Sequence, residues 1–168
     1  MTKITLISDT HSYFDEQIEK HLYDADEIWH AGDFGEVDTL RFSPKNQPIR
    51  GVFGNIDGKN IRSLFPENLQ FYCEGFNVLM THIGGQPGKY PARVKNLLKE
   101  YSPDIIICGH SHILRVVSDP NYKNMLYINP GAAGHEGFHT VRTLIKMQLE
   151  NKKIESIQVV ELGRRGRR

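Results

Sequence analysis

The stretch Asp104-Ile-Ile-Ile-Cys-Gly-His-Ser-His112 joins an apolar run to two histidines at alternate positions. A short apolar run that ends at a glycine is typical of a strand buried on both faces of a sheet. His110 and His112 therefore follow the end of a predicted buried strand. Because alternate residues of an extended chain point to the same side, we expect both imidazoles to face one site.

The same arrangement, an apolar run followed at once by a polar side chain, recurs along the chain. Predicted strands at 3–8, 27–30, 49–53 and 77–81 are followed by Asp9 and His11, by Asp33, by Asn55 and Asp57, and by His82. Each of these residues taken alone has an ordinary explanation as a cap or a turn residue. Because ligands of α/β sheets bind at the carboxyl ends of the strands, the recurrence favours one common site.

The remaining pattern predicts the fold. Helical stretches are expected at 14–22, 37–42 and 91–101, and further strands at 69–74, 104–108, 113–118, 125–128, 140–149 and 154–162. Strands and helices alternate in the first part, which favours parallel pairing, whereas the last part is rich in strands. The last two strands flank Glu150-Asn-Lys-Lys153, a hairpin signal. We predict an α/β fold, a four-layer α/β/β/α sandwich.

Length and charge limit the organisation and the partners. The 168 residues suit one domain, predicted over 1–162, and Gly163-Arg-Arg-Gly-Arg-Arg168 is a basic tail predicted to be disordered. Removing the four arginines of this tail from a chain of net charge +1 leaves −3, which argues against a nucleic-acid partner. No apolar run approaches the ~20 residues of a membrane helix. The beginning of the sequence lacks a signal-peptide layout, so a cytoplasmic location is expected.

The polar residues at the strand ends form a coherent set of ligands. Carboxylates, imidazoles and an amide oxygen are ligands of divalent metals such as Mn, Fe, Ni, Co and Zn. The two cysteines, Cys73 and Cys108, lie outside the set and lack CxxC spacing, so they are interpreted as buried, reduced thiols. The set therefore indicates a metal centre without thiolate ligands.

The order of these short motifs resembles that of a known family. The motifs are Asp9-Thr-His11, Gly32-Asp33, Gly54-Asn55-Ile-Asp57, Thr81-His82, Gly109-His110-Ser-His112 and Asn129-Pro-Gly131. In this order they resemble the calcineurin-like metallophosphoesterase superfamily, and more closely its small bacterial and archaeal phosphodiesterase branch. Each motif alone is weak, but the resemblance runs from Ile4 to about Gly131.

The resemblance implies a two-metal centre and a divalent-metal-dependent phosphodiesterase in which a hydroxide bridges the ions. Manganese is the first expectation for the cofactor, and Fe, Ni, Co, Zn and Mg also suit the ligands. It assigns Asp9, His11 and His112 to the first ion, Asn55, His82 and His110 to the second, and Asp33 to both. It also implies that catalysis depends on Asp9, Asp33, Asn55 and His82.

One position departs from the family pattern. Many members carry a histidine after the glycine–asparagine pair and use it as an acid for the leaving group, but this chain has Ile56 there. His135 and His139 are alternative acids. His139 and Arg142, together with Asn55, are candidates for contact with the substrate phosphate, and the alternative for the first two is a polar loop and an edge strand. The segment 84–90 is expected to shape the mouth of the site.

A second hypothesis is a catalytically weak or inactive protein-binding scaffold on the same fold. The retromer subunit resembles this fold and has lost ligand histidines. Here all seven ligand positions carry competent residues, which favours the enzyme. The expected partner is a small phosphodiester or phosphoester substrate, and the sequence leaves a monomer and a homodimer open.

Overall fold

The computed structural model describes residues 1–36 and 38–166. In chain order its elements are β1 (Thr2–Ile7), α1 (Glu16–Lys20), β2 (Glu27–His30), η1 (Thr39–Phe42), β3 (Ile49–Gly51), α2 (Lys59–Leu64), β4 (Asn68–Cys73), β5 (Phe76–Thr81), α3 (Ala92–Tyr101), β6 (Ile105–Ile107), β7 (Arg115–Asp119), η2 (Pro120–Tyr122), β8 (Met125–Asn129), β9 (Val141–Glu150) and β10 (Lys153–Arg164). The strands form two sheets, with the orders β10-β9-β1-β2-β3 and β4-β5-β6-β8-β7.

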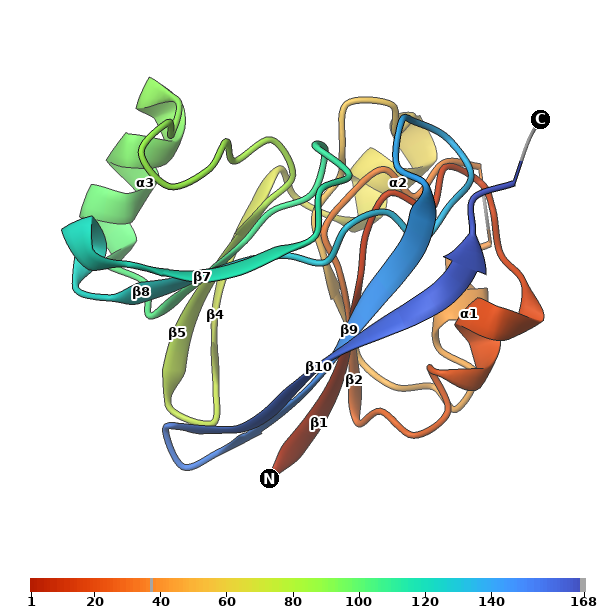
Figure 1. Ribbon diagram of the computed structural model, residues 1–168, viewed down its shortest axis with the longest axis horizontal. Coiled ribbons are helices and arrows are strands. Elements are labelled where there is room, and N and C mark those ends of the chain that lie inside the picture. Colours follow the sequence, from red (N-terminus) through yellow and green to blue (C-terminus); the bar gives the residue numbers. More distant parts are fainter. Residues whose placement is uncertain (37, 167–168) are drawn as a thin grey trace.

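Apolar side chains lie on both faces of each sheet. The two sheets face each other and helices lie outside them, which gives four layers (Figure 1). Leu6 of β1 points between the sheets, where it belongs to the same apolar cluster as Val78 of β5. Its neighbour Ile7 points to the other face and packs with α1. Val94 of α3 covers the outer face of the second sheet. The predicted four-layer α/β/β/α sandwich is confirmed.

The strand pairing brings the carboxyl ends of several strands to one edge in each sheet. In the first sheet β1, β2 and β3 pair in parallel, and in the second sheet β5, β6 and β8 do so. The C-terminal hairpin β9–β10 completes the first sheet, because β9 pairs antiparallel with β1. The β4–β5 hairpin around Gly75 is also as predicted.

Two helical predictions differ from the structure at their ends, and one further helix was not predicted. The helix expected at 14–22 is shorter, because Asp15 caps α1 by accepting a hydrogen bond from the Ile18 amide (2.9 Å). Of the turn expected at 37–42, η1 covers Thr39–Phe42, and Val37 lies outside the described residues. The helix α2 was not predicted; it buries Ile61 and has no side-chain hydrogen bond at its N-cap.

The chain continues in regular structure beyond the predicted domain end at Leu162. Gly163 and Arg164 belong to β10, and the Arg165 amide donates to the Thr140 carbonyl (2.9 Å). Residues 167–168 of the predicted tail lie outside the described residues. Cys73 and Cys108 are buried and free, as predicted. Within the described ranges, no helix combines the length and the apolar character needed to cross a membrane.

Candidate metal centre

Polar loops from both sheets meet at one edge of the sandwich. The loop after β1 carries Asp9, and its amide donates to the Gly32 carbonyl in the loop after β2 (3.0 Å). The His110 amide, after β6 of the second sheet, donates to Asp9 Oδ2 (3.1 Å). These bonds connect the two sheets at the carboxyl ends of their strands, where the sequence predicted the site.

The backbone at this edge adopts a conformation that L-residues rarely adopt. Five of the seven predicted ligands have positive φ angles, namely Asp9 (52°), His11 (45°), Asp33 (56°), His110 (67°) and His112 (59°). Such angles cost free energy at non-glycine positions and cluster at functional sites. These five residues therefore lie in sharp turns that follow the strands, not in extended continuations of the strands.

The predicted ligands form two groups. Asp9, His11 and His112 make one, and Asp33, His82 and His110 make the other; within each group the ligand atoms lie within 4.8 Å of one another. Asn55 joins the second group, because its Oδ1 lies 2.9 Å from His110 Nδ1 and 3.1 Å from His82 Nε2.

The carboxylate of Asp33 lies between the two groups. Its Oδ2 is 3.3 Å from His11 Nε2 in the first group and 3.1 Å from His82 Nε2 in the second. Its Oδ1 accepts a hydrogen bond from the Ile56 amide (3.1 Å), which fixes the plane of the carboxylate. Asp33 is thus placed to touch a cation in either group.

Unpaired buried atoms in the first group fit a metal ion. Asp9 Oδ2 accepts hydrogen bonds from Ser8 Oγ (2.6 Å) and from the His110 amide, which leaves Oδ1 toward the imidazoles. Asp9 Oδ1 and His11 Nε2 are buried without a hydrogen-bond partner among residues 1–36 and 38–166. Buried polar atoms are normally paired, so a bound cation is the natural partner for these two.

Hydrogen bonds behind the imidazoles set which nitrogen faces the site. His82 Nδ1 donates to the Ala31 carbonyl (2.7 Å), so its Nε2 carries the free lone pair. His139 Nε2 donates to the Gly134 carbonyl (2.9 Å), so its Nδ1 is an acceptor for His112 Nδ1 (3.3 Å). The Nε2 atom of His112 then faces Asp9 Oδ1 at 3.1 Å. A hydrogen-bond acceptor behind a ligating imidazole in this way orients the ring and raises its basicity.

The charges of the two groups are strongly coupled. Burial alone would raise the pKa of Asp33, but the neighbouring His11 and His82 imidazoles outweigh burial and lower it. Burial likewise opposes the charged form of His11, yet Asp33 and Asp9 raise the pKa of His11 to about 9. A site that attracts protons this strongly attracts metal cations for the same reason, and metal binding releases the protons.

Arg142 and His139, the loop and strand residues predicted to contact the substrate, form hydrogen bonds within the protein. The Arg142 guanidinium is buried and pairs with Asp15 (Nη1 to Oδ2, 3.0 Å), while its Nε donates to the Ala133 carbonyl. The predicted substrate contact of Arg142 is therefore not supported, because its donors are engaged inside the protein. His139 lies behind His112 and orients it. His135 Nδ1 contacts the Arg165 carbonyl, which does not support a role as leaving-group acid.

His30 is a positioning residue for the loops rather than a ligand. It is fully buried, stacks on Phe34 (3.6 Å between ring centroids), and burial lowers its pKa to about 3. The Gly32 amide donates to its Nδ1 (3.2 Å), so its Nε2 donates to Thr10 Oγ1 (3.1 Å). A neutral His30 thus ties together the loops that carry Asp9 and Asp33.

Gly32 gives a direct test of the ligand positions. A Cβ at Gly32 would lie 2.5 Å from His82 Nδ1 and displace its ring. We expect Gly32→Ala to weaken Mn²⁺ binding by about 10–100-fold, the range seen when the support of a metal ligand is lost. Calorimetric titration of chelator-stripped protein with Mn²⁺ measures this.

Gly163 provides the matched control for that substitution. Its φ of +102° is close to the +100° of Gly32, but a Cβ at Gly163 meets nothing within 4 Å. Gly163→Ala therefore carries the same backbone strain without the collision. It should lower stability and leave Mn²⁺ affinity unchanged. Equal affinities in the two variants would contradict the position assigned to His82.

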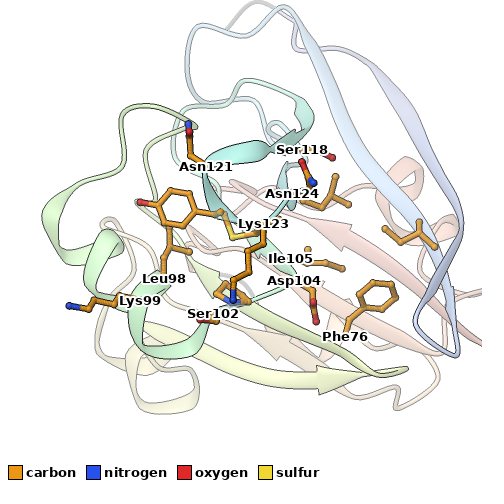
Figure 2. Close-up of a pocket in the computed structure, with 15 residues that line it drawn as sticks. Phe76, Leu98, Lys99, Ser102, Asp104, Ile105, Ser118, Asn121, Lys123 and Asn124 are labelled. Carbon is orange, nitrogen blue, oxygen red and sulfur yellow. The ribbon is translucent and has the colours of Figure 1, made fainter.

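A cavity of about 720 Å³ lies away from this centre (Figure 2). It is lined by Phe76 at the start of β5, Ile105 at the start of β6 and Met125 at the start of β8. The candidate ligands follow the opposite ends of β5 and β6. This cavity therefore lies at the ends of the strands opposite to the candidate ligands, and we do not assign the chemistry to it.

Comparison with known proteins identifies the family of the chain. Residues 2–152 match the calcineurin-like phosphoesterase superfamily domain. The chain is 31% identical over 139 residues to a "Probable metallophosphoesterase" of Mycoplasma pneumoniae, an alignment that covers 79% of each protein.

Solved structures share the fold at low sequence identity. Vps29 from Entamoeba histolytica, complexed with zinc, has a TM-score of 0.71 and 16% identity, covering 96% of this chain and 99% of that one. A novel archaeal phosphodiesterase has a TM-score of 0.66 and 22% identity, covering 95% and 99%. The family match and the sequence identity together show that the chain belongs to the calcineurin-like phosphoesterase superfamily.

Proposed function

We propose that the chain is a phosphodiesterase that uses two divalent metal ions. The observation that carries the proposal is the Asp33 carboxylate, whose Oδ2 lies 3.3 Å from His11 Nε2 and 3.1 Å from His82 Nε2. A carboxylate between two groups of ligands is the arrangement that holds two ions close enough to act on one phosphate. The likeness to the archaeal phosphodiesterase supports the diester specificity.

The seven ligands would hold the ions as two sets that share one carboxylate. Asp9, His11 and His112 suit the first ion, Asn55, His82 and His110 suit the second, and Asp33 suits both. When bound, two adjacent divalent ions lower the pKa of water and neutralise charge on the phosphoryl oxygens. The nitrogen and oxygen ligands accept several metals, and we propose manganese as the first to test.

The side chains of the protein orient the phosphate. Asn55 directs its Oδ1 at His82 and His110, so its exposed Nδ2 is free to donate to a phosphoryl oxygen. In hydrolysis the oxygen of water bonds to phosphorus and one ester P–O bond breaks, with its electron pair leaving on the alcohol oxygen. The exposed side chain of Ile56 cannot supply a proton to that oxygen. Diesters whose leaving alcohol has a low pKa should therefore be hydrolysed faster.

Hydrolysis of bis(p-nitrophenyl) phosphate tests the proposal, because p-nitrophenolate needs no acid. We expect chelator-stripped protein to be inactive and added Mn²⁺ to restore p-nitrophenolate release, followed by absorbance. A rate that is unaffected by chelation would contradict metal dependence. No hydrolysis with any of Mn²⁺, Fe²⁺, Ni²⁺, Co²⁺, Zn²⁺ or Mg²⁺ would contradict the enzyme.

An absence of hydrolysis with every metal would favour the protein-binding scaffold. Two exposed apolar side chains are neighbours in sequence of residues of the centre: Ile56 follows the candidate ligand Asn55, and the fully exposed Phe138 precedes His139, which orients His112. Apolar residues on a rim are typical of surfaces that bind proteins. The Vps29 neighbours share the fold, so a protein-binding role is the second candidate function.

A further inference from the structure

A hollow of about 360 Å³ opens beside the candidate metal ligand His110. The loop after His82 and the loop after His110 form its walls, and they contribute Ile83 and Ile113, which are 41% and 65% exposed. Tyr127 of β8 lines it too, and its hydroxyl donates to the Gly85 carbonyl (2.7 Å), which steadies the first loop. The hollow therefore has apolar walls and adjoins the site of chemistry.

Two cations line the same hollow, and neither has an acidic partner. Arg115 is half-buried at the start of β7, and its Nη1 donates to Gln86 Oε1 (2.9 Å). Lys89 is exposed. Among the residues the structure describes, neither cation forms an ion pair, and no aspartate or glutamate lines the hollow. The hollow is thus electrostatically suited to an anion.

A second hollow, of about 310 Å³, is lined by His82 and differs in charge. Its arginines are engaged: Arg93 donates to Asn68 Oδ1 (2.6 Å) and to the Ile83 carbonyl, and Arg62 donates to the Asp57 carbonyl (2.7 Å). The carboxylate of Glu67 also lines it. Among the described residues that line the two hollows, a carboxylate occurs only in the second, so the hollow with Lys89 and Arg115 is the one suited to an anion.

We propose that the hollow with Lys89 and Arg115 binds one of the two organic groups of the substrate diester, the one that stays on the phosphate when the leaving group departs. We also propose that this group carries a second phosphate. The inference rests on the proposed phosphodiesterase function. A volume at the lower end of ligand pockets suits one nucleoside-sized group rather than a polymer. Ile83 and Ile113 contact the body of the group, and Arg115 offers its planar fork of donors to the distal phosphate.

Two matched substrates test the inference. Thymidine 5′-(p-nitrophenyl phosphate) and its 3′-phosphorylated form have the same scissile bond and the same leaving group, and differ in one distal phosphate. We expect the distal phosphate to raise kcat/KM about 10-fold, the factor that one charge-assisted pair supplies. Calorimetry adds a readout independent of turnover: thymidine 3′,5′-bisphosphate should bind more tightly than thymidine 5′-monophosphate by a similar factor.

Substitutions assign the effect to Arg115. Arg115→Gln should bring two ratios close to one: the ratio of kcat/KM values and the ratio of affinities, each with and without the distal phosphate. Arg115→Lys should retain part of the gain. Lys153→Gln is the control, because it removes an exposed cation at the start of β10, and it should leave both ratios unchanged. Hydrolysis of both esters by the parent protein with equal kcat/KM and equal binding of the two nucleotides would overturn the inference. If neither ester is hydrolysed with any metal, the proposed phosphodiesterase function is contradicted instead. The ratio of the two nucleotide affinities, measured by calorimetry, then still decides whether the hollow binds the distal phosphate.

Discussion

Asp33→Asn should reduce Mn²⁺-dependent hydrolysis of bis(p-nitrophenyl) phosphate by at least about 10³-fold, because a metal clamp contributes several kcal/mol of charge stabilisation. Asparagine keeps the size of the side chain and tolerates the φ of 56° at this position, so the backbone is not strained further. Its Oδ1 can still accept from the Ile56 amide. The amide nitrogen would then replace Oδ2, the atom near His11 and His82, and it cannot ligate a cation.

Three measurements separate this loss from a folding defect. The circular dichroism spectrum of the variant should match that of the parent, and calorimetry should show weakened or incomplete Mn²⁺ binding. Asp104→Asn is the control, because Asp104 lies at the opposite end of the second sheet, where it pairs with Lys152. It should retain full activity. A fully active Asp33→Asn would remove Asp33 from the metal centre.

The position of the candidate ligands could be predicted from the sequence because each follows the end of an apolar run. The run 3–8 locates Asp9, and the run 104–108 locates His110 and His112. Parallel pairing then places such residues at a common edge, whatever the details of the loops. The helix α2 could not be predicted in this way, because it has only one buried residue, Ile61, and therefore no apolar periodicity.

The residues that position the ligands depend on contacts that no local pattern reveals. His139 orients His112 from 27 residues away, and the carbonyl of Ala31 fixes His82 from 51 residues away. A histidine on a loop has the same local sequence signal whether it contacts substrate or another histidine. The role of His139 therefore follows from the contact between its loop and the loop of His112, which the local sequence does not reveal.

The role of Arg142 also depends on contacts between distant parts of the sequence, and the loss of these contacts should have a large effect on stability. Its guanidinium forms a bidentate pair with Asp15, 127 residues earlier (Nη1 to Oδ2, 3.0 Å; Nη2 to Oδ1, 3.2 Å), and lies 4.8 Å over the Tyr13 ring. Its Nε donates to the Ala133 carbonyl (2.6 Å). Arg142 thus connects β9, the loop before it and the N-terminal cap of α1.

Arg142→Met should lower the free energy of unfolding by about 3 kcal/mol. This is the lower end of the cost of breaking a buried pair, because the Asp15 side chain is 24% exposed and partly screened. For a chain of this size we expect a melting temperature lower by about 6–12 °C, measured by calorimetry. Arg50→Met is the control: Arg50 pairs with Glu27 but is 34% exposed, so its loss should cost only about 1 kcal/mol.

The dependence on pH provides a further check on the pair. Burial alone would raise the pKa of Asp15, but Arg142 and the Ile18 amide outweigh it and lower the pKa below its ordinary value of 3.8. The stabilisation is therefore complete above that value and is lost as pH falls through the lower, folded-state pKa. Parent and Arg142→Met should differ most in stability at neutral pH and converge in acid. A constant difference across this range would show that Arg142 stabilises the fold by packing alone.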